Sequence, residues 1–420
     1  MKFAADFHIH SKYSRATSPQ MDLENLDKWA KIKGIKVLGT GDFTHPEWFK
    51  NLEEKLEPAE AGLFKLKNSD SPTRFILTSE ISCIYSKKDK VRKIHIIVFA
   101  PSFKTAEKIN TQLAKIGNLR ADGRPILGLD AKELAKIVLD ADKDCAVIPA
   151  HAWTPWFAIF GSKSGFDSVE ECFEEYSKHI YAIETGLSSD PAMNWRLSQL
   201  DKVALISNSD AHSPHKIGRE ANVFDTEINY QSIFDAIKYK DPKKFLYTIE
   251  FFPEEGKYHY DGHRLCNLSL SPAESKKYNN ICPRCAKPLV IGVLNRVEEL
   301  ADRPERFRPK NAIPFKSLIP LQEIIADSIG VSAASKEVLR LYNNLITNLG
   351  TEFDILLEKG REEIEKNSLP EIAEGVLRVR NGKVFVAPGY DGVYGKIKIF
   401  SENSRERKNK KNALNQKTLF

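Results

Sequence analysis

AADFHIH (residues 4–10) is the first of seven stretches of strand length that end at or close to a histidine or an acidic residue. The other six are VLGTGDFTH (37–45), FILTSE (75–80), KIHIIVFA (93–100), AVIPAH (146–151), YAIET (181–185) and ALISNSDAH (204–212). Amphipathic stretches such as Leu23–Lys33, Thr105–Ile116 and Ala131–Leu139 lie between them, which predicts β/α units. We expect each strand to stop at its histidine or acid, at the mouth of a barrel where catalytic groups gather.

Histidine is concentrated in these stretches, which hold six of the ten histidines of the chain. Imidazoles and carboxylates together suit borderline and hard divalent cations, and acids can bridge two ions. We therefore predict a multinuclear metal site at the mouth of the barrel. Its candidate ligands and catalytic residues are His8, His10, Glu80, His95, His151, Asp210 and His212, with Asp42, His45 and Glu184 as further metal ligands.

Each of these residues has an ordinary interpretation when it is taken alone. An HxH pair such as His8 and His10 is often incidental, His95 would be a satisfied core histidine, and Glu80 a capping acid. The ordinary interpretation must explain all of them together, which favours the metal site. Side chains alternate along a strand, so His8 and His10 share one face, and Asp210 and His212 repeat this spacing.

Size and composition restrict the class of protein. A chain of 420 residues can hold two or three domains, and a net charge of +6 permits an anionic partner without requiring one. The longest apolar runs, such as Ile94–Ala100, are far shorter than the roughly 20 residues that a membrane span needs, and Met1 leads directly into the first strand. With six cysteines that do not resemble a disulfide framework, we expect a cytoplasmic protein.

Four residues predict a second metal site. His263 and Cys266 form one closely spaced pair, and Cys282 and Cys285 form another. Two such pairs give a closed, tetrahedral Cys3His zinc site, which is structural because it leaves no position for a substrate. The alternative is a set of unrelated thiols in a loop. The other cysteines, Cys83, Cys145 and Cys172, lie in apolar or helical surroundings, where ordinary burial is expected.

The chain divides into four predicted parts. Residues 1–250 form the α/β barrel, and residues 251–311 form the zinc-binding module. Residues 312–400 form a mainly helical domain, because PLQEIIADSIG (320–330) and the stretch that follows have a spacing of about 3.6 residues. Residues 401–420 are polar and basic, and we expect a flexible tail.

The barrel motifs resemble those of the PHP (polymerase and histidinol phosphatase) superfamily. HIHSKYS (8–14), Glu80, His95, PAHAW (149–153) and SNSDAH (207–212) match in order and spacing. The resemblance implies a distorted (β/α)7 barrel with two or three divalent ions, zinc, magnesium or manganese. It assigns His8, His10, Glu80 and Asp210 to the first ion, Glu80, His95 and His151 to the second, and His212 with Asp42 or His45 to the third. The chain departs from the usual second motif, since Phe43 replaces its histidine.

The strings outside the barrel are similar to those of the endonuclease Q family of archaea and some bacteria. They are DGHRLC (261–266), ICPRC (281–285), GVLNRVEELADRP (292–304), PLQEIIADSIG and PGYDGVYGKIKIF (388–400). The resemblance implies a DNA endonuclease that cleaves on the 5′ side of a deaminated base (hypoxanthine, uracil or xanthine) or an abasic site, using a metal-activated water. The alternatives are a small-molecule phosphatase of the PHP type and a non-enzymatic nucleic-acid-binding scaffold.

Two segments near the predicted mouth are candidates for DNA contact. Lys87, Lys88, Lys90, Arg92 and Lys93 form a basic cluster that a phosphate backbone would use, although such runs are often solvated faces. AHAWTPWFAIFGSKSGF (150–166) is an aromatic, glycine-rich loop. Its Trp153, Trp156, Phe157 and Phe160 are expected to stack on a lesion base or wedge into the duplex, and the alternative is a hydrophobic lid packed on the barrel.

The last residues suggest a protein partner. Gln416-Lys417-Thr418-Leu419-Phe420 follows the basic stretch Arg405–Lys411 and resembles the peptide that binds the PCNA sliding clamp. The match is incomplete, because the usual pattern has two aromatic residues three and four positions after the leucine. A random basic tail is the alternative.

Overall fold

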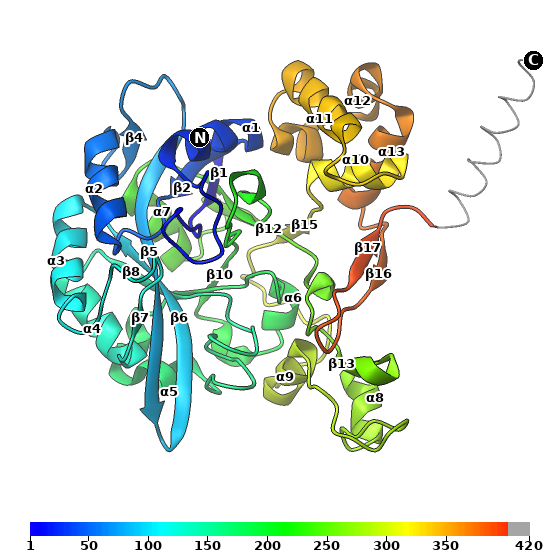
Figure 1. Cartoon of the computed structure of the whole chain (residues 1–420), viewed down its shortest axis with the longest axis horizontal. Coiled ribbons are helices and arrows are strands. Elements are labelled where there is room, and N and C mark those ends of the chain that lie inside the picture. The colour runs from blue at the N-terminus through cyan, green and yellow to red at the C-terminus, as the bar shows by residue number, and fades with distance from the viewer. Residues whose placement is uncertain (402–420) are drawn as a thin grey trace, which may run out of the picture.

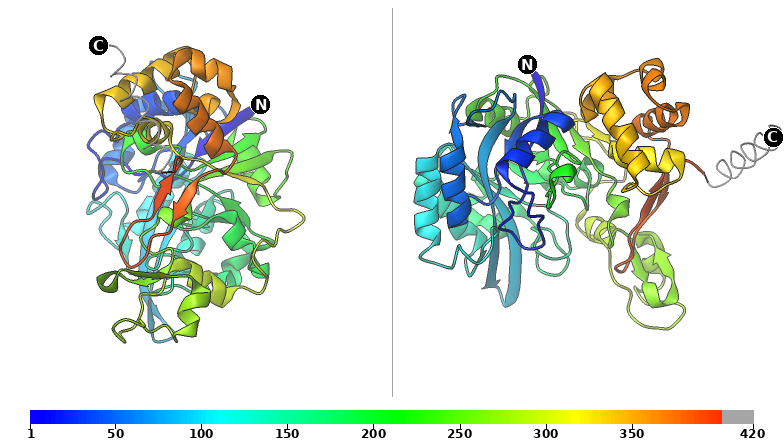
Figure 2. Two further views of the ribbon diagram at one scale, coloured as in Figure 1. Left: turned by 90° about the vertical axis from the view of Figure 1, so that its right-hand side faces the viewer. Right: turned by 45° about the horizontal axis from the view of Figure 1, so that its top comes forward.

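The computed structural model describes residues 1–401, which form a barrel, a small cysteine-containing module and a helical part (Figure 1). The barrel is formed by the chain up to Glu250, and the other two parts lie at opposite ends of one flank of it (Figure 2). The prediction of an α/β barrel followed by these two parts is confirmed. The basic stretch 405–411 and the clamp-like segment 416–420 lie outside the described residues.

The barrel wall consists of a curved, mixed sheet and a separate pair of parallel strands. Its strands are β1 (Lys2–Asp6), β2 (Ile35–Gly39), β3 (Leu56–Pro58), β4 (Phe64–Leu66), β5 (Arg74–Lys87), β6 (Lys90–Ala100), β7 (Ile126–Leu127), β8 (Ala146–Pro149), β9 (Ala182–Glu184), β10 (Ala204–Ile206), β11 (Ala221–Asp225) and β12 (Phe245–Glu250). The order around the wall is β12-β11-β1-β2-β5-β6-β8, and the parallel pair β9-β10 lies beside β8. Phe7, Phe99 and Phe224 pack together in its interior.

Amphipathic helices cover the outside of the wall. They are α1 (Leu23–Lys33), α2 (Pro46–Lys55), α3 (Phe103–Leu113), α4 (Ala131–Ala141), α5 (Val169–Phe173), α6 (Pro191–Asn194) and α7 (Tyr230–Lys238). Local signals fix their ends. Asp22 caps α1 by accepting a hydrogen bond from the amide of Asn25 at 2.9 Å, and Gly34 ends it with φ of 89°. The predicted ends of α1, α3 and α4 differ from the observed ends by at most three residues.

The strand ends predicted at Glu80 and His95 are wrong. Both residues lie in the middle of strands of a long antiparallel hairpin, β5–β6, in which Ser82 is opposite His95 and Glu80 is opposite Ile97. No helix separates β5 from β6, and the hairpin projects beyond the barrel (Figure 1). The residues after Glu80, ISCIYSK, are rich in β-branched and aromatic types, which explains why the strand continues.

The cysteine-containing module is small. It consists of β13 (Asp261–His263), a 3-10 turn η5 (Arg264–Cys266), β14 (Leu268–Leu270), α8 (Pro272–Lys277) and α9 (Val293–Leu300). Buried Asp261 ties it together, because its carboxylate accepts hydrogen bonds from the amide of Gly292 at 2.7 Å and from Asn295 at 2.6 Å. Its own apolar core is only Leu270, Cys282 and Leu289 with a few half-buried neighbours.

The helical part is attached to the barrel by a strand and a buried ion pair. Its elements are α10 (Leu321–Ile329), α11 (Lys336–Leu349), a π-helical turn η6 (Asp354–Glu358), α12 (Arg361–Asn367), α13 (Pro370–Arg380) and the hairpin β16 (Phe385–Ala387)–β17 (Lys396–Lys398). Before it, β15 (Phe315–Ser317) pairs in parallel with β12 at the edge of the barrel sheet. Lys33 of α1 binds Glu352 at 2.7 Å, and Tyr342 donates to the same buried carboxylate. Within residues 1–401, no helix is long and apolar enough to cross a membrane.

Candidate metal centre

The first group of ligands brings together residues from the beginning and from the end of the barrel sequence. His8 and His10 follow β1, Asp210 follows β10, and Glu80 projects from β5. Nε2 of His10 lies 3.1 Å from Oε2 of Glu80 and 3.0 Å from Oδ1 of Asp210. Nε2 of His8 lies 3.5 Å and 3.6 Å from the same two oxygens. The four side chains therefore converge on one point.

The second group shares Glu80 with the first. Oε1 of Glu80 lies 2.7 Å from Nδ1 of His95 and 3.1 Å from Nε2 of His151, which follows β8. The two ring nitrogens are 3.2 Å apart. One oxygen of Glu80 thus faces each group, which is the arrangement of a carboxylate that bridges two ions.

Both groups fit divalent cations. Nε2 of His8, Nε2 of His10 and Oδ1 of Asp210 are buried and lack a partner in hydrogen-bonding geometry. Unsatisfied buried polar atoms are costly, so three of them around one point call for a ligand. A tetrahedral ion with bonds of about 2.1 Å separates its ligand atoms by about 3.4 Å, close to the spacing observed. The donor set of imidazole and carboxylate suits zinc, manganese or another borderline divalent ion.

Two further carboxylates contact the ring nitrogens of His8 and His10 that face away from the ligand group. Oε2 of Glu184 lies 3.0 Å from Nδ1 of His8 and accepts a hydrogen bond from the amide of His151 at 2.8 Å. Oδ1 of Asp42 lies 3.1 Å from Nδ1 of His10. Carboxylates in this position fix the tautomer and the ring orientation of a ligating histidine. Both had been predicted as metal ligands, and the structure places them outside the two ligand groups.

The residues predicted for a third ion do not form a group of their own. Nδ1 of His212 lies 2.8 Å from the carbonyl oxygen of Asp210, and its ring is 4.5 Å from that of His10. The ring of His45 stacks on Tyr13 at 4.4 Å. Among the residues that the structure describes, no cluster of three metal-binding side chains includes His212, His45 or Asp42.

The backbone is strained at three of these positions. Asp42, His151 and Asp210 have φ of 51°, 31° and 47°, in the left-handed region that non-glycine residues seldom adopt. Gly186 packs against His151 so closely that a Cβ on it would lie 2.5 Å from the Cβ of His151. Strain of this kind persists where surrounding contacts impose it, and it is concentrated at functional sites.

The charges of the centre act on one another. Burial alone would lower the pKa of His8, but Glu184, Glu80 and Asp210 raise it well above its usual value. Burial alone would raise the pKa of Glu80, but His95, Arg124 and His8 hold it well below its usual range. The raised pKa values of His8 and His10 favour the protonated rings in the absence of an ion, and a cation would take the place of those protons.

Arg124 belongs to the centre and was not predicted. Its Nη1 donates a hydrogen bond to Oε2 of Glu80 at 3.1 Å. It lies in the loop ADGRP (121–125) between α3 and β7, where a turn sequence is the only local signal. Nothing in such a loop indicates that it folds over the carboxyl ends of distant strands.

The aromatic loop separates into buried and exposed residues. Trp153 is 1% exposed, donates from Nε1 to Asn194 at 2.8 Å and packs on Phe160. Trp156 is 51% exposed, and the ring of Phe157 lies 4.6 Å from that of His95. Trp156 also lines a crevice of about 250 Å³, which is bounded by Thr154, Pro155, Ser188, Pro253, Gly256, Lys257, Tyr258, His259 and Val293. Thr154 Oγ1 is 3.3 Å from Nδ1 of His151, so this crevice adjoins the second ligand group.

Three of the predicted basic contacts have partners within the chain. Lys87 binds Asp130 at 3.2 Å and Glu174 at 2.8 Å. Lys88 lies 3.5 Å from Glu171, and buried Arg92 stacks on Phe166 at 4.0 Å. In the same basic cluster, Nζ of Lys93 lies 5.1 Å from the ring of Trp156 and 5.4 Å from that of Phe157, whose ring packs on His95 of the second ligand group.

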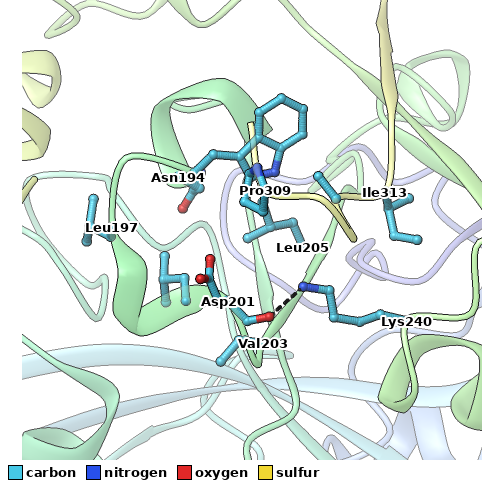
Figure 3. A pocket seen from close by; sticks show the side chains of 11 residues that line it. Asn194, Leu197, Asp201, Val203, Leu205, Lys240, Pro309 and Ile313 are labelled. Atoms are coloured by element: carbon cyan, nitrogen blue, oxygen red, sulfur yellow. Dashed lines mark hydrogen bonds between the residues drawn. The ribbon is translucent and has the colours of Figure 1, made fainter. Parts of the chain in front are cut away.

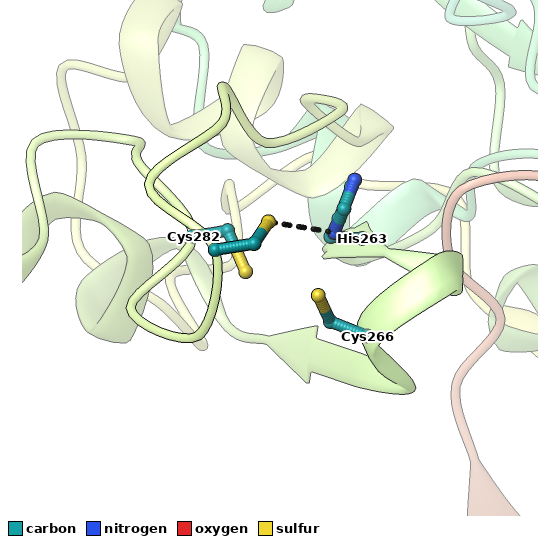
Figure 4. A group of neighbouring side chains, drawn as sticks. His263, Cys266 and Cys282 are labelled. Carbon is teal, nitrogen blue, oxygen red and sulfur yellow. Dashed lines mark hydrogen bonds between the residues drawn. The ribbon is translucent and has the colours of Figure 1, made fainter.

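The Cys3His cluster is assembled as predicted. The ligand atoms of His263, Cys266, Cys282 and Cys285 all lie within 4.8 Å of one another (Figure 4). Cys282 and Cys285 lie on a tight knuckle, in which Ala286 donates its amide to the carbonyl of Cys282 at 2.8 Å. All four positions of a tetrahedral ion are filled by protein atoms, which is typical of a structural zinc site.

A small pocket on the barrel flank is a packing feature. It has a volume of about 20 Å³ and lies where residues 309–313 cross the barrel (Figure 3). Nζ of Lys240 donates to the carbonyl of Asp201 at 2.8 Å across it. A volume of this size holds about one water molecule.

Comparison with known proteins gives matches over nearly the whole chain. A family model described as the MJ0043 C-terminal domain matches residues 320–383. Protein YqxK of Bacillus subtilis is 30% identical over 416 residues, 94% of this chain and 99% of that protein. Protein MJ0043 of Methanocaldococcus jannaschii is 36% identical over 258 residues, which are 59% of this chain but only 31% of that longer protein.

Two solved structures are similar over the same extent. The lesion-specific endonuclease PfuEndoQ of Pyrococcus furiosus is 32% identical, with a TM-score of 0.85 and 96% of each chain covered. Endonuclease Q in complex with a 27-mer duplex that has an abasic lesion at the active site is 31% identical, with a TM-score of 0.83. That match covers 96% of this chain and 98% of the other.

Proposed function

The chain belongs to the endonuclease Q family, and from this premise we propose that it is a metal-dependent DNA endonuclease of repair. The proposed reaction is hydrolysis of the phosphodiester on the 5′ side of a deaminated base or an abasic site. One observation carries the metal dependence. Glu80 presents one oxygen to each of two ligand groups, and the first group contains three buried atoms that have no partner in hydrogen-bonding geometry.

The exposure of the side chains supports an approach of the phosphate from the side of Asp210 and His212. His8, His10 and Glu80 are buried, whereas the side chains of Asp210 and His212 are 27% and 31% exposed. Two divalent ions bound here would lower the pKa of a water molecule and neutralise charge on the phosphoryl group. The residues of the chain fix the geometry, because Glu184 and Asp42 orient His8 and His10 toward the shared carboxylate.

We propose that the crevice beside Trp156 receives the lesion nucleotide. An enzyme that acts at a damaged base takes it out of the stack and reads its Watson–Crick edge. Burial lowers the pKa of His259 to about 4, so this ring is neutral, and it hydrogen-bonds the carbonyl of Pro253. Its buried Nδ1 has no partner and is then an acceptor. Hypoxanthine and uracil present a ring N–H at the edge where their parent bases, adenine and cytosine, present an acceptor, so an acceptor at this place favours these two deaminated bases over their parents.

Loss of cleavage with retained binding tests the endonuclease proposal. Asp210→Ala and His10→Ala should abolish cleavage of an inosine-containing duplex while DNA binding is largely kept. Asp144→Ala and His179→Ala change exposed residues of the same types on the barrel surface and serve as controls. Full cleavage by Asp210→Ala with ions still bound would refute the assignment. Turnover of a sugar or amino-alcohol phosphate without cleavage of the duplex would indicate a small-molecule phosphatase.

We also propose that residues 416–420 bind the PCNA sliding clamp. The support is the sequence of that segment together with the repair function. Attachment through this segment would raise the local concentration of the enzyme on clamp-loaded DNA. Deletion of residues 413–420 should remove clamp binding and leave cleavage of free oligonucleotides unchanged; a full chain that binds no clamp contradicts the proposal.

A further inference from the structure

Arg124 occupies a position between the two ligand groups. Its guanidinium hydrogen-bonds Oε2 of Glu80, the carboxylate that both groups share. Its charge also acts on Asp210 of the first group, on the neighbouring His212 and on His95 of the second group. The guanidinium thus contacts the carboxylate that the two groups have in common.

The loop that carries Arg124 is held rigidly against the site. Gly123 donates its amide to the carbonyl of Tyr13 at 3.0 Å, and Pro125 accepts from the amide of Ser82 at 3.0 Å. A Cβ on Gly123 would lie 2.3 Å from Oδ2 of Asp42, so only glycine permits this approach. The residues on both sides of Arg124 are thus anchored, which places its side chain without help from a substrate.

Arg124 also faces solvent with most of its hydrogen-bonding capacity free. Its side chain is 25% exposed, and those of Asp210 and His212 are similarly exposed, whereas His8, His10 and Glu80 of the first group are buried. Within residues 1–401, the guanidinium makes a single hydrogen bond, from Nη1 to Glu80. An arginine has five N–H donors, so four remain for a ligand that arrives from the open side.

We propose that Arg124 is a further catalytic residue that donates hydrogen bonds to a non-bridging oxygen of the scissile phosphate. The inference rests on the proposed endonuclease function. A planar guanidinium beside two ion positions suits a phosphodiester, because the non-bridging oxygens can accept two parallel N–H hydrogen bonds from it. The alternative role is structural, namely neutralisation of buried Glu80. The two roles can be distinguished by binding measurements. Only if Arg124 contacts the phosphate does the effect of its removal depend on the charge of that phosphate.

A double-mutant cycle between the protein and the DNA distinguishes the two roles. Equilibrium binding is measured for the full chain and for Arg124→Ala, each with a lesion duplex that has either a normal phosphate or a neutral methylphosphonate at the scissile position. Loss of a charge-assisted hydrogen bond should weaken binding about tenfold or more when either Arg124 or the charge of the phosphate is removed alone. Arg124→Ala with the methylphosphonate duplex should bind no more weakly than either single change. Arg124→Ala should also reduce the salt dependence of binding by about one phosphate contact.

Two controls accompany the cycle. Arg15→Ala removes a nearby cation whose side chain is 76% exposed and binds Asp122 of the same loop. The effect of Arg15→Ala on the binding free energy should be additive with that of the methylphosphonate. Arg124→Lys keeps the charge but loses the fork. The metal content and melting temperature of each variant show whether the site is intact.

The outcomes separate the proposals. Non-additive losses in Arg124→Ala, with a cleavage rate lowered about 10²–10³-fold, support the phosphate contact. Additive losses, or activity recovered in full by excess metal, overturn it in favour of a structural role. If the wild-type chain does not cleave the inosine duplex, the endonuclease proposal fails, whereas an active wild type with an equally active Arg124→Ala refutes only the role of Arg124.

Discussion

Oε2 of Glu184 lies 3.0 Å from Nδ1 of His8, which leaves Nε2 of the same ring directed at the shared carboxylate of Glu80. Glu184 is completely buried and also accepts hydrogen bonds from the amide of His151 and from the side chain of Asn208. One carboxylate therefore orients a ligand of the first group and fixes the backbone of a ligand of the second. The two groups are coupled through it, as well as through Glu80.

Removal of this carboxylate should weaken metal binding without removing a ligand. We predict that Glu184→Ala lowers the affinity of the barrel for manganese by about 10–100-fold, because His8 loses the acceptor that fixes its tautomer. Manganese titration followed by equilibrium dialysis measures the effect. The matched control, Glu175→Ala, changes an exposed glutamate and should bind as the wild type does. An unchanged affinity in Glu184→Ala would show that ring orientation is maintained by packing alone.

Metal binding should release protons and strengthen as the pH rises. In the absence of ions, carboxylates raise the pKa of His8 and His10 well above the usual value, although burial opposes this. A cation requires the neutral ring, so each proton released makes the affinity rise up to about tenfold per pH unit below that pKa. Calorimetric titration with manganese in buffers of different ionisation enthalpy counts the protons. Affinity that is constant between pH 6 and pH 9 would contradict the prediction.

The sequence predicts which residues form the centre better than it predicts their roles. His8, His10, His151 and Asp210 follow short strands, and the periodicity of the chain locates such ends. Glu80 and His95 reach the same place from the middle of a hairpin, because strand length depends on pairing with a distant partner and not on local composition. Glu184 and Asp42 have the composition of ligands, and only the three-dimensional arrangement shows that they face ring nitrogens on the far side from the ligand groups. Arg124 has no sequence signal, since its loop is brought there by tertiary contacts.

Stability of the barrel should depend on pH through a buried acid outside the ligand groups. Burial raises the pKa of Glu250 to about 8, and burial together with Glu250 raises the pKa of Glu220. An unfolded glutamate titrates near about 4.3. Between these values the unfolded chain has lost a proton that the folded chain keeps, so stability falls as the pH rises, by up to about 1.4 kcal/mol per pH unit.

Glu250→Gln should remove that dependence, because the amide imitates the protonated acid and can still accept from Thr185. Relative to the wild type, the melting temperature of this variant should be higher at pH 8 than at pH 5. Glu227→Gln, at an exposed position, should follow the wild type at both values. Parallel melting curves for Glu250→Gln and the wild type at all pH values would exclude Glu250 as the source.

The Cys3His site should be structural and independent of the barrel. We predict that Cys282→Ser loses one zinc per chain and makes residues 261–292 sensitive to protease, since the module's own core is limited to buried Leu270, Cys282 and Leu289. Metal analysis and limited proteolysis check both effects. Cys145→Ser, in the barrel core, should keep that zinc. Loss of the barrel ions together with the zinc in Cys282→Ser would show that the two centres are not independent.

The two tryptophans of the aromatic loop should give opposite results, because one is buried and the other exposed. Trp153→Ala should lower the free energy of unfolding by about 3–5 kcal/mol through the cavity it leaves. Trp156→Ala should change stability by no more than about 0.5 kcal/mol, yet reduce the preference for an inosine duplex over an adenosine duplex, because the ring borders the crevice next to His151. Thermal denaturation and competitive cleavage at equal metal occupancy measure the two effects. If Trp156→Ala discriminates as well as the wild type while His259→Ala does not, the base is read by the histidine and the tryptophan has no part in the selection.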